Sequence, residues 1–197
     1  MLSILHKIIR AALIIVPIFA FGWLSYKEIA PSGKVAAAYD MRQETPFVSK
    51  LYPKDRVSES YQSANGDFYR TFLAEPVYFD LKPSGQFENV AVTIKYKNSG
   101  AVPIKMGGLI NKTVWAFDWR DLPPTGKAWK TQTEIFDFAK LVPEGKKYRL
   151  GFSASEMQAD QASISEVKAL FIRPELDEKG VVNKLLEGIV WRMNKIF

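Results

Sequence analysis

The sequence predicts an antiparallel β-sandwich that is preceded by a transmembrane helix and followed by an amphipathic helix. Between residues 65 and 174, short runs of alternating apolar and polar residues are separated by turns rich in Gly, Pro and Asn. This region has no room for the helical crossovers that a parallel sheet requires. Residues 11–26 form an uncharged apolar run, and residues 181–197 carry apolar residues at helical spacing.

Residues 1–27 are interpreted as a cytoplasmic leader and a transmembrane anchor. The apolar run at residues 11–26, extended back to Leu5, is about long enough to cross a hydrocarbon core of roughly 30 Å. Arg10 would reach the headgroups on one side, and Trp23 and Tyr26 are typical of the opposite membrane interface. A cleaved signal peptide and a buried core helix are the alternatives. The short leader favours a single-pass protein of the cell membrane with its C-terminal domain extracytoplasmic.

Composition excludes several classes of site. The sequence of 197 residues contains no Cys, so disulfides, thiolate metal sites and a Cys nucleophile are excluded. The single His, His6, precedes the anchor, so the domain has no His-based triad or zinc site. The net charge of +6 is concentrated at the two ends, since residues 1–34 carry four Lys or Arg and one Glu. Basic residues near the ends suit a membrane lipid partner, and no nucleic-acid partner is predicted.

Residues 28–64 are predicted as a linker or stalk, because Pro and Gly interrupt only brief apolar stretches. A short strand is allowed at residues 35–39. The sandwich is assigned to residues 65–174, with seven to nine short strands. The strongest is at 89–97, where Val90, Val92, Ile94 and Tyr96 alternate with more polar residues. The expected strands lie at residues 67–73, 77–81, 89–97, 103–110, 113–120, 131–138, 147–154 and 164–173.

Several of these segments together resemble a known class of domain. The strands VYFDL and NVAVTIKYK, a tryptophan-rich segment, the hairpin EGKKYRLGFSAS and the closing strand ISEVKALFIRP resemble the jelly-roll sandwiches of carbohydrate-binding modules and galactose-binding-like domains. The resemblance covers residues 67–174. The chain is also similar to uncharacterised, singly anchored envelope proteins of bacteria. The resemblance to carbohydrate-binding modules implies a sugar-binding face built from aromatic side chains, on which the apolar faces of pyranose rings stack.

The ligand-binding candidates are three tryptophans and the polar residues beside them. They are Trp115, Trp119, Trp129, Asp118, Arg120 and Asp121. Trp115, Phe117 and Trp119 alternate on one side of an expected strand, a pattern that is more often a core face than a binding platform. Trp129 lies among lysines and turn residues, so it is expected to be the most exposed of the three.

Metal and catalytic sites are not predicted. Oxygen donors that a structural calcium ion would use are present at Asp67, Asp80, Glu88, Asp118 and Asp160. No D-x-D-x-D-G loop accompanies them, and no cofactor motif occurs. A glycosidase would need two carboxylates, and the available pairs are Asp118 with Asp121 and Glu134 with Asp137. Acidic pairs in a strongly charged domain are usually solvated, so the protein is predicted not to be an enzyme.

The tail, residues 175–197, is predicted as an amphipathic helix that is too polar to span a bilayer. Three uses are open: packing against the sandwich as core, docking a partner subunit, or lying in the membrane interface. The interfacial use would place Trp191 at headgroup depth and direct three basic residues toward anionic lipid. Those basic residues are Lys184, Arg192 and Lys195.

The predicted function is that of a non-catalytic binding or scaffolding module at the cell envelope, with envelope glycan as the favoured ligand. One alternative is a structural subunit of a membrane complex, which would use a sheet face or the C-terminal helix against an envelope protein partner. The other is a carboxylate-based glycoside hydrolase.

Overall fold

The computed structural model describes residues 33–83, 87–153 and 161–173, together with His6, Leu13 and residues 15–18 near the amino end. The chain divides into two compact units. One unit is Lys34–Arg173, which contains all the described strands, and the other consists of Met1–Gly33 and Pro174–Phe197.

Eleven strands and one short 3₁₀ helix make up the described part of the domain. They are β1 (Lys34–Tyr39), η1 (Lys54–Arg56), β2 (Tyr61–Gln62), β3 (Phe68–Thr71), β4 (Val77–Leu81), β5 (Asn89–Asn98), β6 (Ile104–Asn111), β7 (Ala116–Leu122), β8 (Lys130–Asp137), β9 (Pro143–Glu144), β10 (Lys147–Ser153) and β11 (Ala162–Ile172). Eight of the strands overlap the eight expected from alternation. The two-residue strands β2 and β9 are too short to produce a pattern in the sequence.

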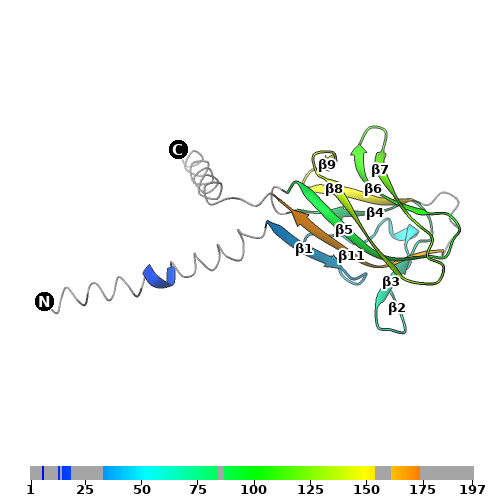
Figure 1. Ribbon diagram of the computed structural model, residues 1–197, viewed down its shortest axis with the longest axis horizontal. Helices are drawn as coiled ribbons and strands as arrows, with labels where there is room; N and C mark the ends of the chain where they lie inside the picture. Colours follow the sequence, from blue (N-terminus) through cyan, green and yellow to red (C-terminus); the bar gives the residue numbers. More distant parts are fainter. Residues whose placement is uncertain are drawn as a thin grey trace. The chain divides into compact units, whose positions relative to one another are not determined.

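Sheet A has six strands in the order β2-β3-β11-β5-β8, with β1 also paired to β11 (Figure 1). Because β5 pairs along one whole edge of β11, β1 and β3 share the other edge. β1 pairs with Val167 to Ile172, and β3 pairs with Ser163 and Ile164. A β-bulge between Ile164 and Glu166 separates these two stretches of β11.

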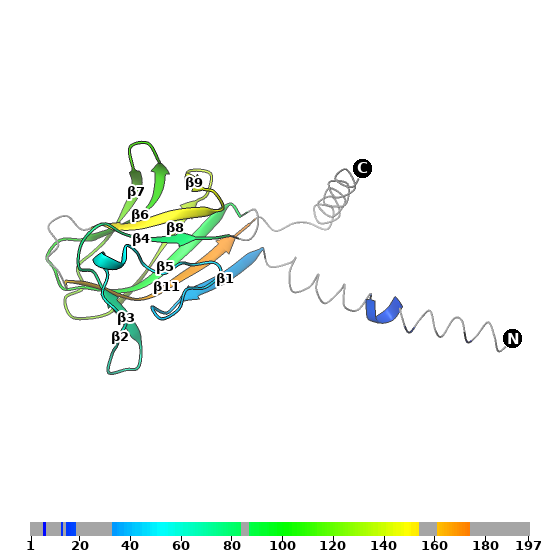
Figure 2. The same ribbon diagram turned by 180° about the vertical axis from the view of Figure 1, so that it is seen from behind.

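Sheet B has the order β4-β10-β6-β7, with β9 paired to the start of β10. All of its pairs are antiparallel. The two sheets lie face to face, as Figures 1 and 2 show from opposite sides. The antiparallel β-sandwich predicted from the sequence is therefore confirmed.

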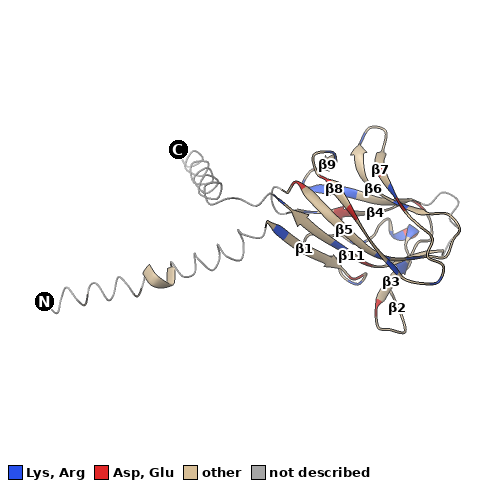
Figure 3. Ribbon diagram, viewed as in Figure 1, with Lys and Arg blue, Asp and Glu red and all other residues tan. Residues whose placement is uncertain are grey.

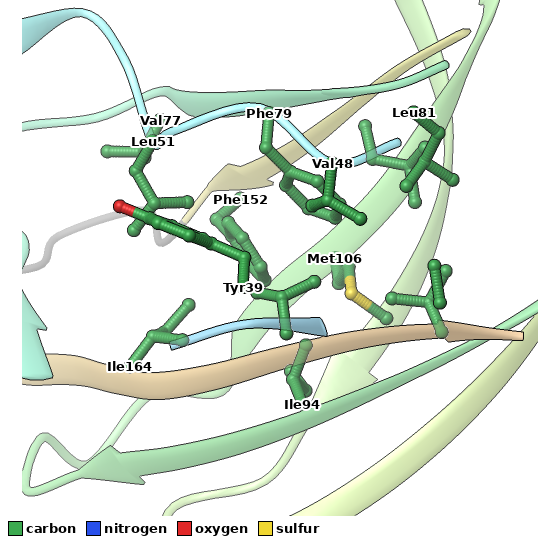
Figure 4. Packing of buried hydrophobic residues seen from close by; sticks show 14 of the residues in the cluster. Tyr39, Val48, Leu51, Val77, Phe79, Leu81, Ile94, Met106, Phe152 and Ile164 are labelled. Atoms are coloured by element: carbon green, nitrogen blue, oxygen red, sulfur yellow. The ribbon is translucent and has the colours of Figure 1, made fainter. Parts of the chain in front are cut away.

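The core lies between the two sheets and follows the alternation of their strands. In β5, Val90, Val92, Ile94 and Tyr96 are fully buried, as the sequence pattern indicated. Phe152 of β10 packs against two other buried phenylalanines, with ring centroids 5.5 Å from both Phe72 and Phe79. Figure 4 shows Phe152 and Phe79 among side chains that come from both sheets.

Residues 34–64 differ most from the sequence prediction, which assigned them to a linker. β1 pairs with β11 over its full length, and the following segment runs along β4 through bridges at Val48 and Tyr52. Tyr39, Val48 and Leu51 are buried core residues, and Figure 4 shows them packed among residues of the sheets. The brief apolar stretches in this region are therefore contacts with the core, and the domain begins near Lys34.

The predicted helices lie largely outside the described residues. Of the anchor, only His6, Leu13 and residues 15–18 are described; these are helical, and residues 15–18 are exposed. Among the described residues, no helix has the length and apolar character needed to cross a membrane. The tail at residues 175–197 and the interface residues Arg10, Trp23, Tyr26, Lys184, Trp191, Arg192 and Lys195 lie outside the described residues. Within the domain, acidic and basic residues are interspersed along both sheets (Figure 3).

Candidate functional site

The outer surface of sheet B carries four aromatic side chains, here named the aromatic face: Tyr78, Trp115, Phe117 and Trp119. The rings of Tyr78 and Phe117 are 6.0 Å apart and nearly parallel, at 17°. Phe117 stacks on Trp119 at 4.8 Å and 22°, and on Trp115 at 6.4 Å and 23°. Tyr78 points outward because its neighbours in β4, Val77 and Phe79, fill the core.

Two glycines form the floor beneath these rings. Register places Tyr78, Gly151, Gly107 and Trp119 in one row across the four strands β4, β10, β6 and β7. A Cβ at Gly151 would lie 3.0 Å from the Tyr78 ring and 3.2 Å from the Phe117 ring. A Cβ at Gly107 would lie 2.7 Å from the Trp119 ring. The rings can approach the backbone of the inner strands only because these two positions lack side chains.

Replacing Gly107 with Ala is expected to lower the free energy of unfolding by about 1–3 kcal/mol, as overpacking does. The new methyl group would lie 2.8 Å from the carbonyl oxygen of Asp118, which is backbone and cannot move without disturbing the pairing of β6 with β7. Urea denaturation measures the change. Gly100→Ala is the matched control, because the nearest atom there is the flexible end of the Gln161 side chain. Equal losses in both variants would contradict the role assigned to Gly107.

Arg149 of β10 lies at one margin of the aromatic face. Its Cζ is 5.4 Å from the centroid of Trp115, 5.8 Å from Tyr78 and 5.4 Å from Tyr52, all within cation–π range. Its Nε donates to the Tyr52 hydroxyl at 2.7 Å, and its Nη2 pairs with Glu144 at 2.5 Å. Only 15% of the Arg149 side chain is exposed, so these contacts hold it in one position.

Asp80 anchors this network from beneath. It is buried, it accepts a hydrogen bond from the Tyr52 hydroxyl at 2.5 Å, and it pairs with Lys147 at 3.0 Å. Burial alone would raise the pKa of Asp80, but hydrogen bonds from Tyr52 and Lys147 and the charge of Arg149 outweigh it and lower the pKa. Burial, followed by the hydrogen bond to Asp80, raises the pKa of Tyr52. Lys112 also pairs with Glu144, at 3.8 Å, so three cations share two carboxylates at this margin of the face.

Three of the six predicted site residues share this surface. Trp115 and Trp119 belong to the aromatic face. Asp121 lies on the same side of β7, opposite the exposed Lys105. The aromatic side of β7 is therefore the outer side of sheet B and not its core side.

Asp118 and Arg120 lie on the other side of β7. Arg120 is paired in register with the buried Met106, so both it and Asp118 point toward the gap between the sheets. They form a bidentate ion pair, in which Nη1 and Nη2 of Arg120 lie 2.7 and 2.8 Å from the two carboxylate oxygens of Asp118. That hydrogen bond raises the pKa of Arg120. The sequence predicted Asp118 and Arg120 to lie beside the aromatic rings. They lie on the opposite side of the sheet, because successive residues of a strand point to opposite faces.

Trp115 lies just before β7, which begins later than predicted. The side chain of Asn111 accepts hydrogen bonds from the backbone N–H of Thr113 and Val114, closing a turn, and Trp115 then has a positive φ of 50°. The turn leaves Trp115 48% exposed while its ring still meets Tyr78.

Trp129 lies apart from the other two tryptophans. It is packed edge-on against Tyr69 of sheet A, with 5.9 Å between the ring centroids. Trp129 was expected to be the most exposed of the three tryptophans, but it is only partly exposed, and Trp115 is more exposed. Neighbouring lysines and turn residues indicate a loop, but they do not reveal that a side chain from another strand covers the ring.

Sequence reasoning did not identify Tyr52, Tyr78, Arg149 or the two floor glycines as parts of a site. Tyr78 had a usable signal: three core positions in VYFDL place it on the opposite side of the strand. The pair at Gly107 and Gly108 also indicates a close approach within a strand. Arg149 and Tyr52 had no local signal, since their meeting depends on the pairing of distant segments.

The candidate catalytic and metal-binding carboxylates are mostly engaged elsewhere. Asp118 is held by Arg120, and Asp137 accepts a hydrogen bond from the backbone N–H of Ala139 at 2.8 Å. Asp67 pairs with Lys95 at 2.6 Å. Within residues 33–83, 87–153 and 161–173, no three acidic or His side chains gather in a way that would hold a metal ion. Asp160 lies outside the described residues.

No family model and no curated protein sequence matches this chain. Solved structures of similar fold include a xylan-binding CBM22 domain of Xyn10C from Paenibacillus barcinonensis, with a TM-score of 0.51 and 10% identity over 70% of this chain and 94% of that one. Another is the CBM35 of Abf62 from Cellvibrio japonicus, with a TM-score of 0.46 and 17% identity over 71% and 99%. The similarity at these identities concerns the fold, and the domain shares the β-sandwich of carbohydrate-binding modules.

Proposed function

We propose that this protein is a non-catalytic glycan-binding module that binds a glycan chain of the cell envelope through its aromatic face. The observation that carries the proposal is the set of nearly parallel rings of Tyr78, Phe117 and Trp119 above a glycine floor. Flat, parallel rings suit the apolar faces of successive pyranose units. The polar margin around Arg149 supplies donors and acceptors for sugar hydroxyls.

Trp119→Ala is expected to weaken glycan binding about tenfold, since a lost stacking contact of about 1–1.5 kcal/mol corresponds to that factor. Trp119 is the suitable residue because it lies at the edge of sheet B, outside the core cluster. Isothermal titration calorimetry with chitohexaose, cellohexaose and xylohexaose measures the effect on the sandwich domain in the full chain.

The matched control is Ile135→Ala, which removes another exposed apolar side chain, from sheet A. It is expected to leave the affinity unchanged. Equal affinity of the wild type and Trp119→Ala for each of the three sugars would contradict the proposal. Loss of a stable protein complex from the Trp119→Ala strain, without any measurable glycan affinity in the wild type, would favour the structural-subunit alternative.

The proposed location is the outer side of the cell membrane, with the domain held by a helix at residues 11–26. This part of the proposal is supported by the sequence alone, through the uncharged apolar run and its flanking Arg10, Trp23 and Tyr26. Protease treatment of intact cells tests it, because an extracytoplasmic domain is digested without lysis. Protection of the domain until the cells are lysed would contradict it.

A further inference from the structure

A second aromatic cluster lies on the outer face of sheet A, on the other side of the sandwich from the aromatic face. Tyr61 of β2 and Tyr69 of β3 are direct cross-strand partners, with ring centroids 5.9 Å apart. Trp129 comes from the segment between β7 and β8 and packs against Tyr69 at 5.9 Å. Tyr61 is 52% exposed, so part of the cluster is open to a ligand.

Lys97 of β5 reaches over this cluster. Its Nζ is 5.5 Å from the centroid of Trp129 and 5.9 Å from that of Tyr69. Register aligns Lys97 with Ser163 and Thr71, whose hydroxyls are 3.1 Å apart and buried. These short side chains leave space above the sheet in which the ammonium group and the Tyr69 ring can meet.

The charge of Lys97 is not balanced by a carboxylate among the described residues, whereas that of its neighbour Lys95 is paired with Asp67 at 2.6 Å. Lys127 and Lys130, on either side of Trp129, are also exposed and form no ion pair in the described part of the chain. The cluster therefore has a positive surplus, whereas the charge of Arg149 is paired with Asp80 and Glu144.

A polar cavity of about 380 Å³ lies next to this cluster and is lined by other residues. It lies where β1 and β3 meet the bulge of β11, and Lys95 lines it two residues from Lys97 on the same face of β5. Its three carboxylates are paired: Asp40 with Arg42 at 2.5 Å, Asp67 with Lys95 at 2.6 Å, and Glu166 with Lys168 at 2.9 Å. Such fixed pairs offer acceptors and donors to sugar hydroxyls while leaving Lys97 as the unbalanced charge.

We infer that this cluster and cavity form a second glycan site, which selects a chain bearing carboxylate groups, such as a uronate-containing polysaccharide. An aromatic surface stacks on the sugar ring, and an ammonium with no acidic partner pairs with the sugar carboxylate. The inference goes beyond the proposed function, because it assigns a separate site, selective for carboxylate-bearing chains, on the opposite sheet.

The test compares hexagalacturonate with its fully methyl-esterified form, which has the same sugar rings without charge. Binding to the full chain is followed by calorimetry and by amide shifts in NMR spectra. The wild type is expected to bind the acid at least tenfold more tightly than the ester, and to lose affinity as NaCl is raised. Lys97→Ala is expected to weaken binding of the acid about tenfold, and Lys97→Arg to restore most of it.

Lys50→Ala is the matched control, because it removes an exposed lysine from the segment that runs along β4 of sheet B. It is expected to leave binding of the acid unchanged. Trp119→Ala is also expected to leave it unchanged, so failure of this inference can be distinguished from failure of the proposed function. Tyr61→Ala is expected to weaken binding of the acid. It should not unfold the domain, since Tyr61 is exposed. Equal affinity for acid and ester, or equal losses in the Lys50 and Lys97 variants, would overturn the inference. Binding of phosphatidylglycerol vesicles through Lys97 without binding of the acid would overturn it as well.

Discussion

Asp80→Ala is expected to lower the free energy of unfolding by about 3 kcal/mol, because it leaves Arg149 and the Tyr52 hydroxyl without their buried partner. This loss is at the lower end of the range for breaking a buried ion pair, because Glu144 still pairs with Arg149 in the variant. Urea denaturation at pH 7 measures it. Asp55→Ala, which removes an exposed carboxylate from η1, is the control and should change stability by less than about 0.5 kcal/mol.

The same network predicts the direction of acid sensitivity. The pKa of Asp80 is lower in the folded protein than its ordinary value of about 3.9. Its stabilising contribution is therefore complete above that ordinary value and is lost as the pH falls through the folded pKa. Stability measured from pH 5 down to pH 2 should fall less steeply in Asp80→Ala than in the wild type. Parallel pH profiles would contradict the assigned role.

Phe152→Ala is expected to have the largest effect on stability, a loss of about 3–5 kcal/mol in the free energy of unfolding. The side chain is 1% exposed and contacts Phe72 and Phe79, so its removal leaves a cavity between the two sheets. Thermal and urea denaturation measure the loss. Ile135→Ala, at a position 63% exposed, is the control and should be nearly neutral. A change of less than about 1 kcal/mol in Phe152→Ala would show that the core closes around the missing ring.

The strands of the sandwich could be predicted because their signal is local. Alternation in β5 gives both its position and its buried side, and Pro- and Gly-rich turns mark its ends. The segment that contains Val48 and Leu51 had no such signal. Its apolar residues are single contacts with the edge of sheet B, and only the pairing of distant residues shows that they are core.

The candidate site was predictable in part for the same reason. Alternation places Phe117 and Trp119 on one side of β7, but it does not say which side faces the core. That choice depends on the register with β6, which places Gly107 opposite Trp119 and Met106 opposite Arg120. The charged network depends on three separate segments, so no window of the sequence contains it.

The placement of β11 has a consequence for how the domain is made. This strand is the last of the domain in chain order, yet β1, β3 and β5 all pair with it. Sheet A therefore stays incomplete on the ribosome until Ile172, which pairs with Lys34 at the start of β1, has been synthesised. Pairings of such long range form slowly and leave strand edges open in the meantime. Until β11 has been made, β1 lacks the strand with which it pairs, and β3 and β5 each have one open edge.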